Sequence, residues 1–240
     1  MSRSANRTRN LRGEGLRLRG EILGAARELL EQTGSEEAIT LRSVARQVGI
    51  SAPSIYAHFA DRDAIVDAIV ADTFHDLAEV AQKAAASEQD PVDRLLALGH
   101  AYLRFAEEQP ERYRVLFNRY RPLDAGGPAP ATAADPVVEG LVGGRAFAPL
   151  IDVITACVES GESDSRSPFE DAVALWVTLH GYSSLRQRMR TFPWPDEEPF
   201  VRTFILRAAR VTPRTRDAQD SRASAHPEET EETEETEQLS

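Results

Sequence analysis

Residues 44–63 read VARQVGISAPSIYAHFADRD, and this stretch decides how the rest of the chain is interpreted. Apolar residues recur at helical spacing on both sides of Gly49. Two short helices joined by a glycine-containing turn of three or four residues form a helix-turn-helix unit. Ala45 supplies the small residue that the helix crossing needs, and Gly49 tolerates the positive φ of the turn. We therefore predict a helix-turn-helix unit, with an ordinary helical hairpin as the alternative.

Charge is distributed unevenly along the chain. The net charge is −11, yet no Asp or Glu occurs from Ala38 to Ala60. Residues 1–62 carry ten arginines against seven acidic residues, whereas residues 63–211 carry 15 basic and 23 acidic residues. DNA carries about one negative charge per 1.7 Å of duplex axis, so a misplaced carboxylate is repelled from it. The carboxylate-free window is therefore suited to contact a polyanion, partly through the N–H groups at the start of its second helix.

The remaining sequence predicts an all-α protein of about nine helices. Capping residues mark the helix starts, in three cases with a proline at the first helical position. These starts are Thr40, Ser51, Asp61, Asp90-Pro91, Asp135-Pro136 and Ser167-Pro168. We predict a disordered basic arm over residues 1–16, a three-helix DNA-binding domain over 17–63, a second helical domain over 64–211, and a disordered acidic tail over 212–240.

The segment TLRSVARQVGISAPSIYAHFADRDAI, residues 40–65, resembles the DNA-binding signature of TetR-family transcriptional regulators. The resemblance extends over about residues 17–70. It implies that a homodimer binds double-stranded operator DNA through a set of residues around the turn. The implied phosphate contacts are Thr40, Tyr56, His58 and Arg62; the implied base contacts are Ala52, Pro53 and Ser54; Arg42 flanks them and Ser51 begins the recognition helix.

Pro53 departs from the family pattern, which often has Lys, Arg or Gly there. Because proline donates no hydrogen bond, base recognition then depends on Ser54, Arg42 and contact with thymine methyl groups. Taken singly, Tyr56 is equally compatible with a half-buried aromatic residue, and His58 with an ordinary surface histidine. The arginines of the arm suit either the minor groove or a tail that only aids solubility.

Residues 91–211, called the body of the chain from here on, resemble a TetR-family C-terminal half. The segment LWVTLHGYSSL, residues 175–185, is similar to the WHG-type effector domain. The resemblance implies that residues 64–211 form an effector-binding and dimerisation domain, with a cavity for a small hydrophobic effector and a dimer interface; the alternative is a monomer with an ordinary core. The aromatic or polar residues predicted to line that cavity are Tyr102, Phe105, Tyr113, Phe117, Trp176 and His180. A buried backbone carbonyl is an alternative partner for His180.

The sequence argues against an enzyme. It contains no HExxH, CxxC, GxSxG or P-loop motif, and its five histidines show no metal-ligand spacing, so neither a catalytic residue nor a metal or other cofactor is predicted. Cys157 is the single cysteine and follows an apolar run, as a core residue does. No apolar run approaches the roughly 18 residues that span a bilayer, so we expect no membrane association and a cytoplasmic location.

Together these features predict a DNA-binding transcriptional regulator, most simply a ligand-responsive repressor that binds an inverted-repeat operator as a homodimer. Two alternatives stay open at this point. One is a DNA-binding regulator without a small-molecule effector, and the other is an enzyme on a helical scaffold. Binding of a hydrophobic metabolite would argue against the regulator without an effector. Weaker DNA binding after changes at Tyr56 and Arg62 would argue against the enzyme.

Overall fold

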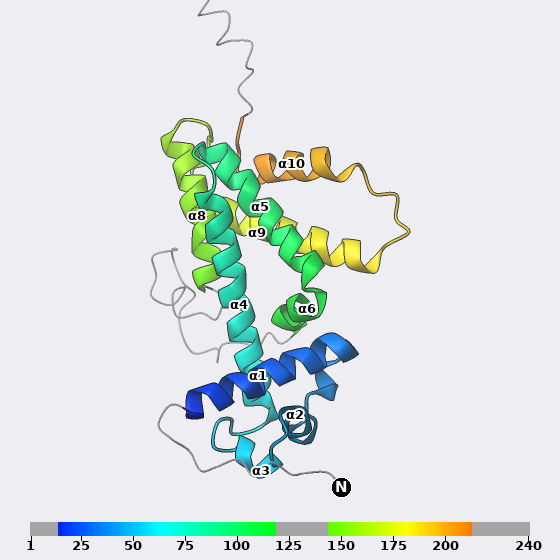
Figure 1. The fold of residues 1–240 in the computed structure, drawn as a ribbon. Helices are drawn as coiled ribbons and strands as arrows, with labels where there is room; N and C mark the ends of the chain where they lie inside the picture. The colour runs from blue at the N-terminus through cyan, green and yellow to red at the C-terminus, as the bar shows by residue number, and fades with distance from the viewer. Residues whose placement is uncertain (1–13, 119–143, 213–240) are drawn as a thin grey trace, which may run out of the picture.

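The computed structural model describes residues 14–118 and 144–212, and these are entirely helical apart from their connections (Figure 1). One isolated bridge, between Ser163 and Val211, is the only β-type pairing among them. The elements are α1 (Glu14–Thr33), the 3-10 helix η1 (Glu36–Ala38), α2 (Leu41–Val48), α3 (Ala52–Ile55), α4 (Arg62–Ala86), α5 (Pro91–Glu108), α6 (Pro110–Asn118), α8 (Gly144–Glu159), α9 (Pro168–Arg188) and α10 (Glu197–Ala208). The all-α prediction is confirmed.

Some predicted features lie outside the described residues. These are the arginines of the N-terminal arm, the helix start at Asp135-Pro136, and the acidic tail beyond Thr212. The predicted arm of residues 1–16 extends too far, because α1 already begins at Glu14. Gly15 and Leu16 therefore belong to the first helix.

Most of the predicted caps form as their side chains require. Thr40 accepts from the Ser43 N–H, Asp61 from the Ala64 N–H, and Asp90 from two N–H groups at the start of α5. Gly49 ends α2 in the left-handed region, with φ 76°. These caps depend only on residues within a few positions, which is why the sequence predicts them.

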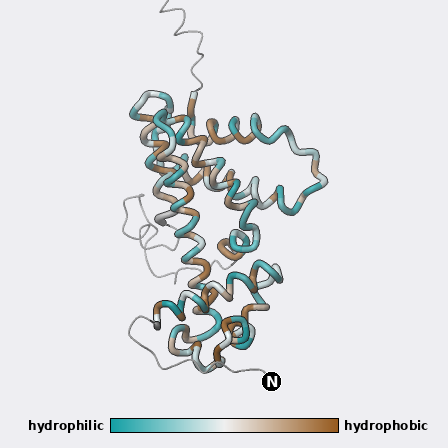
Figure 2. The backbone as a smooth tube through the Cα atoms, in the orientation of Figure 1, coloured by the Kyte–Doolittle hydropathy of each residue, from teal (hydrophilic) through white to brown (hydrophobic). Residues whose placement is uncertain are grey.

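Two hydrophobic clusters organise the fold, and α4 contributes to both. The first cluster joins α1–α3 to the beginning of α4 through residues such as Ile22, Val44, Ile55 and Ile69. The second lies within the body and takes Leu77 and Ala81 from α4, together with buried residues of α5, α8, α9 and α10. Figure 1 shows α4 running from the α1–α3 end into the body, and Figure 2 shows hydrophobic and hydrophilic residues alternating along the helices. A single continuous helix therefore connects the two clusters mechanically.

The short helix α6 makes a second connection. Its Val115 is buried in the first cluster, whereas Tyr113 and Leu116 are buried in the second. Arg114 donates to the carbonyl oxygen of Gly34, at the end of α1. Arg112 forms a 2.5 Å ion pair with Asp76 on α4. Any displacement of α6 therefore acts on both the α1–α3 unit and the body.

Candidate nucleic-acid interface

The α2–α3 turn is fixed by local hydrogen bonds. Thr40 and Ser43 form a capping box, in which the Ser43 N–H donates to Thr40 Oγ1 over 3.0 Å and the Thr40 N–H donates to Ser43 Oγ over 2.9 Å. At the other end, the Ile50 N–H donates to the Ala45 carbonyl over 2.9 Å, closing the turn around Gly49. The Thr40 hydroxyl also lies 3.0 Å from Ser43 Oγ. A phosphate contact by that hydroxyl therefore competes with the capping box.

The recognition segment departs from the expected helix. α3 is a single turn, Ala52–Ile55, and Ser51 makes no side-chain capping bond. The Ser51 hydroxyl instead lies 2.7 Å from that of Ser54, which corrects the prediction that Ser51 caps this helix. Pro53 has no N–H, and the Ser54 N–H already donates to the Ser51 carbonyl. A single turn with few free N–H groups attracts phosphate weakly, so positive charge here comes from α2 rather than from the α3 N-terminus.

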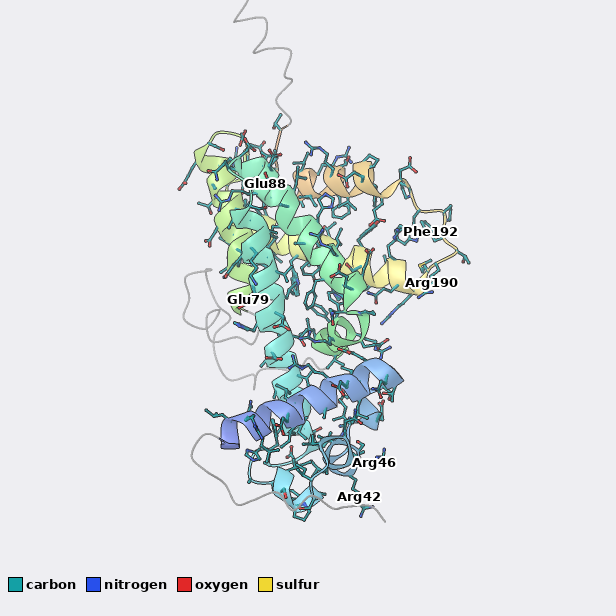
Figure 3. All side chains as sticks on the ribbon, in the orientation of Figure 1. Arg42, Arg46, Glu79, Glu88, Arg190 and Phe192 are labelled. Atoms are coloured by element: carbon teal, nitrogen blue, oxygen red, sulfur yellow. The ribbon has the colours of Figure 1, made fainter. Side chains whose placement is uncertain are left out.

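The predicted contact residues lie on the end of the molecule farthest from α10. Arg42 and Arg46 are exposed on α2, and Figure 3 labels both at this end. Pro53 is exposed, and the Tyr56 side chain is 60% exposed, which is unusual for a large aromatic residue. Ala52, Ser54 and His58 are partly exposed. The surface thus combines two arginines and an exposed tyrosine side chain with small residues. The segment from Ala38 to Ala60 contains no Asp or Glu, so it adds no carboxylate.

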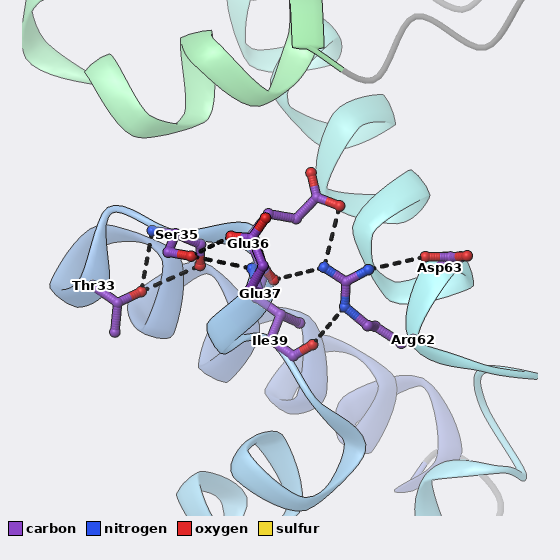
Figure 4. A network of polar contacts seen from close by, with 7 residues as sticks. All are labelled: Thr33, Ser35, Glu36, Glu37, Ile39, Arg62 and Asp63. Carbon is purple, nitrogen blue, oxygen red and sulfur yellow. Dashed lines mark hydrogen bonds and ion pairs between the residues drawn. The ribbon is translucent and has the colours of Figure 1, made fainter.

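Arg62 is the exception among the predicted contacts. Its Nε donates to the Ile39 carbonyl over 2.9 Å, and its Nη2 donates to the Glu36 carbonyl over 2.8 Å (Figure 4). The guanidinium also pairs with the carboxylates of Glu36 and Asp63, each at 3.2 Å. These bonds tie the first residue of α4 to the segment that leads from α1 into α2.

The bonds of Arg62 favour a positioning role, whereas its sequence position predicts a phosphate contact. Two of its donors satisfy backbone carbonyls, and two carboxylates neutralise its charge. A guanidinium engaged in this way has little capacity left for a phosphate. The sequence did not indicate the partners, because Glu36 and Ile39 precede Arg62 by 26 and 23 positions.

In the body, five of the six predicted effector residues form one cluster. The hydroxyl of Tyr113 lies 3.0 Å from that of Tyr102 and 2.8 Å from His180 Nδ1. Phe117 packs on His180 with ring centroids 4.0 Å apart, and Trp176 lies beside both rings. Phe105 is buried in the same hydrophobic core but makes none of these hydrogen bonds or ring contacts.

The polar groups of this cluster bond to one another. His180 Nδ1 lies 2.8 Å from the Tyr113 hydroxyl, and its Nε2 lies 3.5 Å from the Ser184 hydroxyl, so its partners among the described residues are hydroxyl groups and not a backbone carbonyl. Burial raises the pKa of Tyr113 to about 12 and raises the pKa of Tyr102 well above its ordinary value. Burial, followed by the charge of Arg188, lowers the pKa of His180. The group is thus a neutral, self-satisfied polar core, and a separate pocket of about 420 Å³ lies between α5 and the end of α9.

The described residues supply little for other chemistry. They contain no group of three or more His, Cys, Asp or Glu side chains that is arranged to hold a metal ion. Cys157 is fully buried, and burial raises the pKa of its thiol to about 11, so it behaves as a core residue. None of the described helices is both long and apolar enough to cross a membrane.

Comparison with known proteins gives two family matches. Residues 22–69 match the model of bacterial regulatory proteins of the tetR family, and residues 95–205 match that of the tetracyclin repressor-like C-terminal domain. The chain is 26% identical over 191 residues to an HTH-type transcriptional regulator of Mycobacterium tuberculosis, covering 77% of this chain and 73% of that protein. It is 30% identical over 98 residues to the nucleoid occlusion factor SlmA of Vibrio campbellii, covering 41% of this chain but only half the length of that protein.

Solved structures agree with the fold. A protein of unknown function from a Rhodococcus species superposes with a TM-score of 0.63 at 25% identity, covering 80% of this chain and 91% of that one. The TetR family transcriptional regulator PfmR of Thermus thermophilus superposes with a TM-score of 0.54 at 19% identity, covering 86% of this chain and all of that one. The two family matches fall on the two hydrophobic clusters: the first spans the α1–α3 unit and the second spans most of the body.

Proposed function

The chain belongs to the TetR family of bacterial regulatory proteins, and we propose that this DNA-binding transcriptional regulator recognises an inverted-repeat operator as a homodimer. The observation that carries the proposal is the exposed α2–α3 surface. It presents Arg42, Arg46 and Tyr56 to solvent from a backbone segment without carboxylates. Arginine and tyrosine side chains of this kind contact phosphates, whereas Ser54 and the Ala52–Pro53 edge face bases.

Arg62 acts one step behind this surface. By holding the segment between α1 and α2 against α4, it sets the orientation of the recognition turn relative to the body. Operator contact through Arg42 and Tyr56 therefore depends on Arg62 without a direct bond between Arg62 and DNA. Thr40 and His58 remain proposed phosphate contacts at the edge of the same surface.

A second copy of the chain is the proposed occupant of the apolar face of α9 and α10. Val177, Leu185, Met189 and Phe200 are large apolar residues left exposed along these two helices. An isologous dimer buries the same face on both subunits and places two recognition turns about a two-fold axis. Half-sites about 34–36 Å apart then follow, so the operator is an inverted repeat.

The proposed regulation is a change in the orientation of α4 and α6. A ligand that binds one orientation of the body more tightly shifts the equilibrium between operator-binding and non-binding forms. A coupling of about 1–3 kcal/mol is typical of such systems. Repression is the simplest outcome, because a dimer seated on an operator obstructs transcription. Since the operator lies on the chromosome, we place the protein in the cytoplasm.

The proposal is tested by electrophoretic shift with DNA from upstream of the protein's own gene, combined with sedimentation of the complex. We expect a complex of two protomers on a duplex that contains an inverted repeat, and no comparable complex on a scrambled duplex. Arg42→Ala and Tyr56→Phe each weaken the specific complex. A monomer in sedimentation, or equal affinity for every duplex, contradicts the proposal.

A further inference from the structure

A pocket separate from the aromatic cluster lies between α5, the C-terminal part of α9 and the segment that follows it. Its volume is about 420 Å³, within the range of pockets that hold small organic ligands. Leu103 and Glu107 form the α5 side, Tyr182 and Arg186 form the α9 side, and Arg190 and Trp194 close it from the connecting segment. Figure 3 labels Arg190 beside this segment.

Tyr182 gives the pocket a polar group that the protein itself does not satisfy. The residue is 7% exposed, and its hydroxyl has no hydrogen-bond partner among residues 14–118 and 144–212. Burial raises the pKa of this phenol, the charge of Glu197 raises it further, and the charges of Arg186 and Glu107 act on it in opposite directions. A buried hydroxyl without a partner is costly, unless a bound molecule accepts its hydrogen bond.

The pocket carries charges of both signs. Arg186 and Arg190 line it together with Glu107, and Glu197 lies beside it as the partner of Arg186. The Arg186 guanidinium lies over the rings of Tyr182 and Trp194, 5.7 and 5.8 Å from their centroids, so these two aromatic faces already hold a cation. Arg186 also pairs with Glu197 over 2.7 Å, so the exposed Arg190 is the cation with more freedom to receive an anionic group.

We propose that this pocket binds a small organic carboxylate whose apolar body packs against Leu103 and Trp194. Its carboxylate accepts hydrogen bonds from the Tyr182 hydroxyl and the Arg190 guanidinium. The site is distinct from the cluster of Tyr113 and His180. The proposal deepens the regulatory function above, because a molecule wedged between α5 and α9 acts on the body that carries α4 and α6.

The test is isothermal titration calorimetry on the full chain with three probes that share one ring system. These are 1-naphthoate, the uncharged 1-naphthalenemethanol and the cationic 1-naphthylmethylammonium. We expect 1-naphthoate to bind at least about tenfold more tightly than either analogue, because charge-assisted hydrogen bonds exceed neutral ones in strength. Tyr182→Phe and Arg190→Gln should each weaken 1-naphthoate binding about fivefold or more. Arg202→Gln, an exposed arginine on α10 outside the lining, should leave it unchanged.

Folding is checked on the same variants. Without a probe, Tyr182→Phe removes a hydroxyl that has no partner, so its thermal unfolding midpoint should equal or exceed that of the parent chain. A stable Tyr182→Phe variant with reduced 1-naphthoate affinity supports the site. Equal binding of all three probes, preference for the cation, no binding at all, or binding unaffected by both variants overturns it. Calorimetry needs no DNA, so failure to find an operator contradicts the proposed function without changing this result.

Discussion

The two ends of the molecule use polar side chains in opposite ways. On the α2–α3 surface, Arg42, Arg46 and Tyr56 face solvent. In the body, Tyr113 and His180 satisfy each other inside the fold. An interface that must bind an external polyanion keeps its donors available, whereas most polar groups buried in a core are paired with one another. The comparison separates residues that contact a partner from residues that hold the shape of the protein.

Arg62 belongs to the second class although its sequence position suggests the first. Replacing it should therefore cost stability, as breaking a core network does. Arg62→Ala leaves the Ile39 carbonyl without its side-chain donor and the Glu36 carbonyl with the Ile39 N–H alone, and we expect the free energy of unfolding to fall by about 2–3 kcal/mol. Arg46→Ala, on the exposed surface, should change it by less than about 0.5 kcal/mol. Urea unfolding of both variants measures the difference, and equal stabilities would remove the distinction.

One substitution at two tyrosines sharpens the comparison. Tyr113→Phe deletes the hydroxyl that contacts both Tyr102 and His180, so the free energy of unfolding should fall by about 1–2 kcal/mol. Tyr56→Phe removes an exposed hydroxyl and should leave the free energy of unfolding within about 0.5 kcal/mol of the parent value, while operator affinity falls. Denaturant unfolding and operator binding are measured on both. A stable Tyr113→Phe variant would contradict the self-satisfied core.

A pair of glycines in the DNA-binding unit tests the turn. Gly49 lies at φ 76° with open space around it, so Gly49→Ala meets backbone strain and no steric obstacle. We expect a loss of about 1–2 kcal/mol of unfolding free energy. Gly24 lies within α1 with no neighbour within 4 Å of an added Cβ, and Gly24→Ala should add about 0.5–1 kcal/mol. Thermal or urea unfolding of both variants measures these two changes in unfolding free energy. Equal changes in the two variants would contradict the left-handed turn at Gly49.

The smallest expected effect is a pH dependence in the body. Because burial lowers the pKa of folded His180, the unfolded chain binds a proton first as the pH falls. The free energy of unfolding should therefore decrease as the pH drops below the ordinary histidine value near 6.5, until folded His180 is protonated too. One proton limits the slope to about 1.4 kcal/mol per pH unit, and partial solvation reduces it. His180→Gln should flatten this part of the curve, and an unchanged slope would exclude His180 as its source.

The sequence predicted features that depend on neighbours along the chain. The caps at Thr40 and Asp61 and the turn at Gly49 each need only residues within a few positions, and all three form. The Ser51 cap failed, because the nearby Ser54 hydroxyl pairs with the Ser51 hydroxyl.

Contacts between residues that are far apart along the sequence could not be predicted in this way. The bonds of Arg62 to Glu36 and Ile39 depend on how the α1–α2 corner folds onto α4. Tyr113, Phe117 and His180, which the sequence predicts to lie at one site, are in contact, but helical spacing does not show which hydrogen bonds they form. The pocket at Tyr182 joins α5 to a segment about 80 residues later, so only the folded chain reveals it.

The salt dependence of operator affinity tests the central claim most directly. For each lost phosphate contact, the slope of log affinity against log salt concentration should fall in magnitude by about 0.9. The account predicts that Arg42→Ala reduces both affinity and slope, whereas Arg62→Ala reduces affinity and keeps the parent slope. The account is contradicted if Arg42→Ala keeps the slope of the parent protein or if Arg62→Ala reduces it. Either result would mean that the contact and positioning roles are assigned to the wrong arginines.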